Sequence, residues 1–334
     1  MARASLPPYF AAVALASTLV CGALAAFELS RPTVTEDAHP HQTQTDTQVN
    51  ASTSTETTVD NETPGAPARP VAYMRTFSFK HLAHDVIVEG SPLRRKRIRR
   101  RLRAFRDTVR AAEDAGVIVG FFLRDLETGA QVSYNADQDF YPASSIKGPY
   151  VVCVYERLVD TGALRAEQVD GIARNTIVNS DNDAYHALIN LCGTEVFAEW
   201  AVNCGAIERD SDEYRSFATV YYPRVTPRQL ARMWEHMYAY LNDASGSGPK
   251  LTEMFIQRVE SPLRAGLRED ITTIAKAGWY PSDNGDAFAA TVDAGIVFDG
   301  THTYVMVLMT TLPDNLGGLA EMVPGIWRAR RTLS

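Results

Sequence analysis

The strongest constraint on the fold is a segment after Lys147 that is apolar around nearly its whole circumference. Its side chains include Val151, Val152, Val154, Tyr155 and Leu158. Pro149 is compatible with a helix here, because a proline is tolerated in the first turn. A helix without a polar face must be covered on all sides. The sequence therefore predicts a buried central helix, which would hold the residues at its start rigidly near the positive end of the helix dipole.

Directly at this start stands the stretch 141–147, in which Ser144 and Lys147 are three residues apart. In a helix this spacing puts both side chains on one face. A serine hydroxyl is a weak nucleophile and needs a nearby base. A lysine can serve as that base only if burial or another cation lowers its pKa. Taken alone, the pair is better explained by a helix start with a solvated lysine.

Two further motifs follow in order. The first is Ser180-Asp181-Asn182, which alone would indicate a helix cap or an Asx turn. The second is Lys276-Ala277-Gly278, which alone would indicate a solvated strand end. A serine-x-x-lysine motif, then S-D-N, then K-T-G is the signature of class A β-lactamases and penicillin-binding proteins. Over roughly residues 93–334 the chain resembles this superfamily, with Ala277 departing from the threonine or serine of the third motif.

The expected elements fit the same architecture. A strand hairpin over 117–126 and 131–134 precedes a mostly helical block, and three strands and a helix end the chain. We therefore predict an α+β, β-lactamase/DD-peptidase-like fold, with an antiparallel sheet flanked by helices and a mostly helical lobe. The expected later elements are helices at 168–178, 183–191, 196–201, 227–241, 251–259 and 319–330, a helix-poor loop at 210–223, and strands at 271–280, 287–298 and 303–312.

The resemblance implies an acyl-transfer mechanism, and the sequence contains no H-E-x-x-H or G-x-x-x-x-G-K-[ST] motif that would indicate a metal or nucleotide cofactor. Ser144 would attack the amide carbonyl of a β-lactam or a related cell-wall peptide, and Lys147 would accept its proton. Lys276 would lower the pKa of Lys147 by like-charge repulsion and attract a substrate carboxylate. Ser180 would relay a proton to the leaving nitrogen.

Three further residues complete the implied site. Asn182 would bind the side-chain amide of the substrate and help to position Lys147. The backbone N–H groups of Ser144 and Trp279 would form the oxyanion hole. Gly278 would allow the substrate to lie close to its strand.

Two departures bear on activity. Ala277 lacks the hydroxyl that would bind the substrate carboxylate, and the stretch 210–223 lacks the family's E-x-x-L-N pattern. Asp212 and Glu213 are the candidates for the deacylating carboxylate. The alternatives to an efficient hydrolase are a penicillin-binding or DD-peptidase-like protein that deacylates slowly, and a catalytically weak cell-wall-binding homologue.

The N-terminal sequence indicates that the protein is exported. Residues 8–27 form an apolar run near the length that spans a bilayer, which is typical of a signal peptide or a membrane anchor. Cys21 within it leaves lipidation open. We expect residues 28–92, rich in Thr, Ser and Pro, to be a disordered linker whose end is uncertain, with the catalytic domain at 93–334.

Charge and cysteine usage set limits on partners. The net charge of −7 gives no indication of a nucleic-acid partner. The basic run Arg94–Arg101 fits either an anionic surface or the solvated face of a helix with Leu102, Phe105 and Val109 inside. The cysteines lack the C-x-x-C spacing that would predict a zinc site. Two of Cys153, Cys192 and Cys204 could pair in an exported protein, or all three could be buried thiols.

Overall fold

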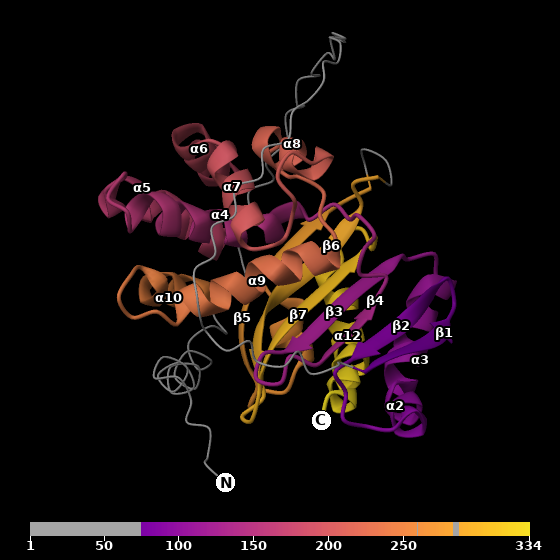
Figure 1. The fold of residues 1–334 in the computed structure, drawn as a ribbon. Coiled ribbons are helices and arrows are strands. Elements are labelled where there is room, and N and C mark those ends of the chain that lie inside the picture. The colour runs from indigo at the N-terminus through magenta and orange to yellow at the C-terminus, as the bar shows by residue number, and fades with distance from the viewer. Residues whose placement is uncertain (1–74, 259, 283–286) are drawn as a thin grey trace, which may run out of the picture. The chain divides into compact units, whose positions relative to one another are not determined.

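A computed structural model describes residues 75–258, 260–282 and 287–334. Its centre is a seven-stranded antiparallel sheet in the order β1-β2-β4-β3-β7-β6-β5, which leaves β5 at one edge (Figure 1). The strands are β1 (Thr76–His81), β2 (His84–Glu89), β3 (Val119–Asp125), β4 (Gln131–Tyr134), β5 (Thr272–Tyr280), β6 (Ala290–Phe298) and β7 (Thr303–Thr310).

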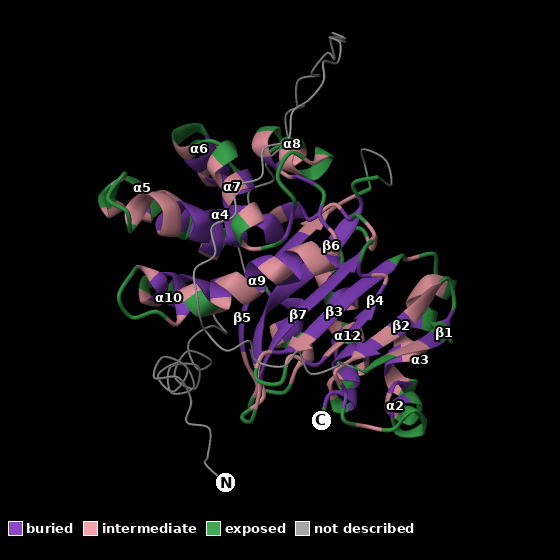
Figure 2. Ribbon diagram, viewed as in Figure 1, coloured by how far each residue is buried: buried purple, intermediate pink, exposed green. Residues whose placement is uncertain are grey.

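The sheet is covered on both faces, so its central strands are buried throughout (Figure 2). Because successive side chains of a strand point to opposite faces, β7 contributes to two separate cores. Val305, Val307 and Met309 pack with the helical lobe. Tyr304 and Met306 pack with the helices near the two ends of the domain.

Most helices form the lobe between β4 and β5. The domain-end layer contains α2 (Arg95–Arg101), α3 (Arg103–Asp114), α12 (Leu316–Trp327) and the 3₁₀ turn η4 (Arg328–Thr332). The segments between β4 and β5 are η1 (Ala143–Ile146), α4 (Lys147–Val154), η2 (Tyr155–Val159), α5 (Ala166–Arg174), η3 (Asn175–Asn179), α6 (Asn182–Cys192), α7 (Glu195–Asn203), α8 (Asp212–Thr219), α9 (Pro227–Leu241), α10 (Gly248–Gln257) and α11 (Pro262–Gly266).

The predicted fold class is confirmed, and so is the central helix, since every residue of α4 is buried. The hairpin β3–β4 and helix α9 also lie where the sequence predicted them. Thr226 caps α9 by accepting a hydrogen bond from the backbone N–H of Gln229, whose side chain in turn accepts from the N–H of Thr226.

Two expectations need correction. The stretch 210–223 was expected to lack helix, but α8 forms there because Ser211 caps it and Phe217 is buried. With one buried side chain, a short helix leaves little periodic signal. The sheet also extends upstream of residue 93, because β1 and β2 pair with each other and β2 pairs with β4. The predicted linker therefore ends before β1.

The predictions for residues 1–27 and for most of the linker concern residues outside the described ranges, as does the one for Cys21. Cys153, Cys192 and Cys204 are free thiols. Within the described ranges, no helix combines the length and apolarity needed to cross a bilayer.

Candidate active site

Ser144 lies in the 3₁₀ turn η1, which continues directly into the buried helix α4. The turn is held by a hydrogen bond from Ser145 Oγ to the carbonyl of Pro142 at 2.7 Å and by one from the N–H of Lys147 to the carbonyl of Ser144. Ala143, directly before Ser144, has a φ of 45°, a conformation that costs energy for a residue with a Cβ. The local backbone is thus strained and rigidly held at the position of the predicted nucleophile.

Lys147 is fully buried, and its ammonium group points at the second motif. Nζ donates hydrogen bonds to the carbonyl of Ser180 at 2.7 Å and to Oδ1 of Asn182 at 2.6 Å, with the carbonyl of Asp181 at 3.3 Å. The pKa of Lys147 is lowered to about 7, mainly by burial; the charge of Asp181 opposes the shift and the charge of Arg258 adds to it. A substantial fraction of the amine is therefore neutral near neutral pH, as a general base requires.

Ser180 has a left-handed backbone, with φ 56° and ψ 27°, immediately after the π-turn η3. Such turns and such strained residues occur frequently at functional sites. The next residue, Asp181, caps α6 by accepting a hydrogen bond from the N–H of Ala184 at 2.6 Å. The carbonyl of Ser180 binds one buried lysine, and its hydroxyl binds another.

This second lysine is Lys276 on β5. It is fully buried, and its Nζ donates to Oγ of Ser180 at 2.7 Å and to the carbonyl of Ala277 at 2.9 Å. Burial holds the pKa of Lys276 well below its usual range, and the charges of Arg258 and Lys147 lower it further. The expected repulsion between the two lysines is therefore present. The main cause that lowers the pKa of Lys147, however, is burial, and the cation acting on it is Arg258 rather than Lys276.

Gly278 brings β5 into direct contact with the turn that carries Ser144. A Cβ at Gly278 would lie 2.5 Å from the backbone nitrogen of Ser144, 2.4 Å from that of Ser145 and 2.6 Å from the carbonyl oxygen of Pro142. These distances exclude any side chain. Because β5 is an edge strand, Trp279 lies next to this contact on a strand with one unpaired edge.

Arg258 is a site residue that sequence reasoning missed. It follows α10, is 1% exposed, and donates from Nη1 to the carbonyl of Val178 at 2.8 Å. Its Nη2 lies 3.0 Å from Oε2 of Glu260, and its guanidinium carbon lies 5.6 Å from the ring centre of Trp279. Nothing in the local sequence distinguishes this arginine, since its position depends on packing between distant segments.

Two more residues were missed for the same reason. The hydroxyl of Tyr222 donates to Oδ1 of Asn182 at 3.2 Å, so this oxygen accepts hydrogen bonds from both a lysine and a tyrosine. Asp293 on β6 is fully buried opposite Ala277, and its Oδ2 accepts from Oγ of Ser261 at 2.6 Å. Its Oδ1 has no hydrogen-bond partner in the described part of the chain. Burial raises the pKa of Asp293 to about 6.

Asp212 and Glu213, the predicted deacylation candidates, are both exposed in the first turn of α8. Asp212 forms an ion pair with Arg215. Neither carboxylate has a hydrogen bond to Lys147, Asn182 or Ser180 among the contacts of the described residues. The fold does not bring these two side chains to the other predicted site residues.

A separate cluster of Asp125, Glu127 and His302 contains side chains of the kind that bind metals, with ligand atoms within 4.8 Å of one another. Asp125 Oδ1 accepts from the N–H groups of Glu127 and Thr128, and Glu127 accepts from the N–H of Thr303. His302 Nδ1 lies 2.8 Å from Asp125 Oδ2. Because these groups connect two turns, we assign the cluster a structural role.

Comparison with known proteins gives a consistent result. A model of the beta-lactamase enzyme family matches residues 98–170 and 168–323. No curated protein matches the chain. A beta-lactamase from Chitinophaga pinensis is 20% identical, with a TM-score of 0.55, covering 68% of this chain and 98% of that one.

Two other solved structures are similar to the same degree. The beta-lactamase from Streptomyces albus G is 20% identical, with a TM-score of 0.55 and coverage of 69% of this chain and 99% of that one. A mutant of PBP-A, solved as its acyl-enzyme complex with penicillin G, is 20% identical, with a TM-score of 0.54 and coverage of 70% and 95%. At this identity the likeness establishes the shared fold.

Proposed function

Because the chain belongs to the beta-lactamase enzyme family, we propose that it is a serine hydrolase in which Ser144 is acylated by a β-lactam or a related cell-wall peptide amide. The observation that carries the proposal is the meeting of two buried lysines at one serine. Lys147 and Lys276 both donate to Ser180, one to its carbonyl and one to its hydroxyl. Burying two ionisable amines side by side is costly, so a functional reason for the arrangement is expected.

In the acylation step, Ser144 Oγ attacks the amide carbonyl while neutral Lys147 accepts the hydroxyl proton. Its pKa of about 7 suits this role. The developing oxyanion would be stabilised by the backbone N–H groups of Ser144 and Trp279. When the carbon–nitrogen bond breaks, the leaving nitrogen takes a proton from the hydroxyl of Ser180. Lys276, which donates to that hydroxyl, replaces the proton, and the proton that Lys147 took from Ser144 keeps the total unchanged. The product is an ester on Ser144.

Substrate binding would use the cations of the same group. A substrate carboxylate would be attracted by Lys276, and Arg258 adds a second positive charge that the family motifs do not include. Asn182 would bind the side-chain amide of the substrate. This assignment is supported by the hydrogen bond that Asn182 Oδ1 already accepts from Lys147 at 2.6 Å, since it fixes the orientation of the asparagine side chain.

A specific observation favours slow deacylation. Hydrolysis of the ester needs a base that activates water near Ser144. Asp212 and Glu213 are exposed on α8. The side chain that donates a hydrogen bond to Asn182 Oδ1 from outside the motifs is Tyr222, which is not a carboxylate. We therefore favour the penicillin-binding or DD-peptidase-like form of this activity, with a long-lived acyl-enzyme, over a fast β-lactamase.

Labelling with a fluorescent penicillin tests the acylation. The wild type should be labelled, and Lys147→Met should lose at least 99% of the labelling rate because the base is gone. Lys250→Met is a matched control, since Lys250 lies on α10 and pairs with Asp170 at 2.9 Å. Equal labelling of Lys147→Met and the wild type would refute the proposal.

We also propose that the protein acts outside the cytoplasm, because its expected substrates are there and residues 8–27 resemble a signal or anchor. Cell fractionation with protease accessibility of the folded domain would test this. Protection of the domain in intact spheroplasts would contradict it.

A further inference from the structure

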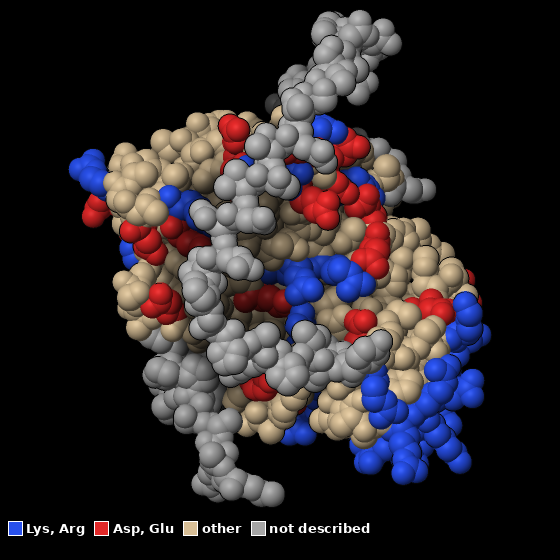
Figure 3. All heavy atoms as spheres, in the orientation of Figure 1, with Lys and Arg blue, Asp and Glu red and all other residues tan. Residues whose placement is uncertain are grey.

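Ten basic side chains lie together on the outer side of α2 and α3. None of them belongs to the candidate active site. Figure 3 shows them as a continuous blue area at the lower right, over the position of α2 in Figure 1. We call this surface the basic face, and it consists of Arg94–Arg97, Arg99–Arg101, Arg103, Arg106 and Arg110.

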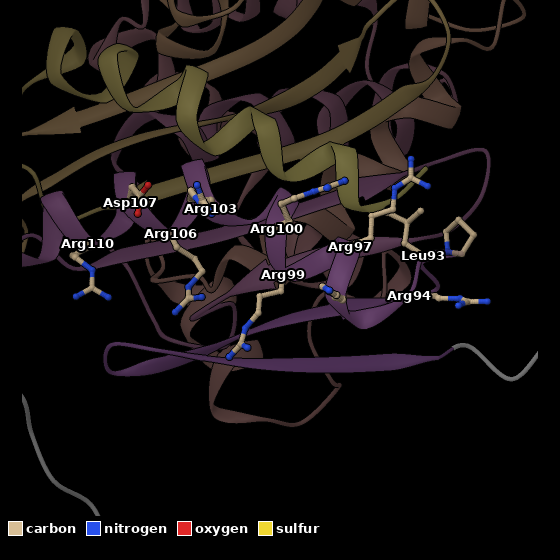
Figure 4. A pocket seen from close by; sticks show the side chains of 11 residues that line it. Leu93, Arg94, Arg97, Arg99, Arg100, Arg103, Arg106, Asp107 and Arg110 are labelled. Atoms are coloured by element: carbon tan, nitrogen blue, oxygen red, sulfur yellow. The ribbon is translucent and has the colours of Figure 1, made fainter.

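The amphipathic character of the two helices explains why these charges point outward. Ile98, Leu102, Phe105 and Val109 are fully buried against the sheet. The residues between them must therefore face solvent. Figure 4 shows Arg99, Arg106 and Arg110 projecting from one side of the helices, along a hollow of about 1090 Å³ that the basic side chains line.

The charges of the basic face are not balanced within the domain. None of the ten side chains forms an ion pair with an aspartate or glutamate among the described residues, and Asp107 is the one acidic residue that lines the hollow. The hydrogen bonds of these arginines go to other groups: Arg95 donates to the carbonyl of Ser78 at 2.8 Å, Arg106 to Nδ1 of His81 at 3.4 Å, and Arg101 to the carbonyl of Arg331 and to an oxygen of Ser334.

This imbalance also affects nearby titratable groups. The pKa of Arg101 is lowered by partial burial and then by the charges of Arg97, Arg100 and Arg331. The pKa of His81, in the β1–β2 hairpin, is lowered by burial and then by the charges of Arg106 and Arg110. Repulsion of this kind destabilises the free protein, and an anionic partner would relieve it. Guanidinium groups bind phosphate oxygens in a bidentate manner, which makes phosphate the best-matched anion.

The neighbouring hairpin indicates which phosphate-bearing partner fits. Arg106 donates to the carbonyl of Lys80 at 3.2 Å, so the tip of the β1–β2 hairpin adjoins the basic face. At that tip Leu82 is 43% exposed, next to Lys80, whose side chain is 95% exposed. An apolar side chain beside a cluster of cations is typical of surfaces that lie on a membrane interface.

We propose that the basic face binds the anionic phosphate headgroups of a lipid bilayer, with Leu82 at the edge of the contact. The interaction holds the domain on a membrane surface in a fixed orientation, with α2 and α3 toward the lipid. It is independent of the acyl-transfer chemistry, because none of the ten side chains belongs to the group around Ser144.

The test is sedimentation of the full chain with vesicles, either of phosphatidylcholine alone or with 30% phosphatidylglycerol, where the percentage is roughly that used to give a strongly negative surface. The face variant replaces with glutamine four arginines whose side chains form no hydrogen bond among the described residues, Arg97, Arg99, Arg100 and Arg103. The control variant removes the same charge from other exposed positions, Arg165, Arg174, Arg209 and Arg268. All three proteins keep residues 8–27, so insertion of that segment affects them equally.

We expect the wild type and the control variant to prefer the anionic vesicles, with binding that weakens as salt is raised. The face variant should bind them at least tenfold more weakly, while its penicillin labelling stays as in the wild type and its thermal unfolding occurs at the same or a higher temperature, since repulsion within the face is reduced. Equal binding of the face variant and the wild type would overturn the proposal. So would wild-type binding to soluble polyphosphate with no preference for anionic over neutral vesicles, which would assign the face to a polymer instead.

Discussion

Lys276 on β5 and Ser180 before α6, ninety-six residues apart in sequence, are joined by a hydrogen bond of 2.7 Å between Nζ and Oγ. The carbonyl of the same serine accepts a hydrogen bond of 2.7 Å from Lys147. One strained residue therefore connects the helix that follows Ser144 with the edge strand of the sheet. The predictions below follow from this connection and from the residues around it.

Acylation should depend on pH through Lys147. Because burial lowers its pKa to about 7, the neutral base is lost below that value. The rate of acylation by penicillin G should rise about tenfold per pH unit below pH 7 and level off above it. Arg258→Met removes a positive charge and should move the midpoint upward, whereas Arg174→Met, on the exposed surface of α5, should not. A wild-type midpoint near 10 would contradict this account.

Gly278→Ala should nearly abolish acylation. Its Cβ would lie 2.5 Å from the backbone nitrogen of Ser144, so β5 or the turn must shift and the oxyanion donors move apart. Loss of such a donor costs about 10²–10³ in rate. Gly171→Ala is the control, because a Cβ there has nothing within 4 Å. Stopped-flow acylation rates measure both, and a fall of less than tenfold in Gly278→Ala would contradict the predicted geometry.

Ala277→Thr and Ala277→Val should differ in stability. The side chain at 277 lies on the same face of the sheet as Asp293, directly opposite, where Oδ1 lacks a partner among the described residues. The two replacements overpack the site equally, but the threonine hydroxyl can donate to that oxygen. We expect the threonine variant to be more stable by about 0.5–1.5 kcal/mol in urea unfolding at pH 7.5. Equal stabilities would show that the hydroxyl does not reach Asp293.

Deacylation should not depend on the two exposed carboxylates of α8. With nitrocefin we expect a burst of about one product per enzyme followed by a slow phase, as for an accumulating acyl-enzyme. Asp212→Asn and Glu213→Gln should leave the slow phase within about twofold of the wild type, since exposed carboxylates remote from the ester contribute little. A tenfold fall in either variant would identify a deacylating base that moves into place during turnover.

Much of this fold could be predicted from local patterns. The apolar segment after Lys147 required a buried helix, and α4 is buried at every residue. The predicted start of the helix at residue 227 agrees with α9, because helix capping depends on residues close in sequence, here Thr226 and Gln229. β1 and β2 were assigned to the linker, since short strands beside a polar segment give little signal.

The site was predictable only where it coincides with the three motifs. Arg258 and Tyr222 could not be found, because their roles depend on contacts with Val178 and Asn182 made by tertiary packing. The cause of the low pKa of Lys147 was also predicted incompletely. Burial cannot be read from a serine-x-x-lysine motif, and it outweighs the neighbouring charges.

Intact-mass analysis after exposure to penicillin G tests the central claim most directly. The wild type should gain the mass of one penicillin per chain, on the peptide that contains Ser144. Ser145→Ala should keep the adduct, because the hydroxyl of Ser145 is buried and donates to Pro142. Ser144→Ala should gain nothing. An unmodified wild type, or an adduct that persists in Ser144→Ala, would contradict the proposal that Ser144 is the nucleophile.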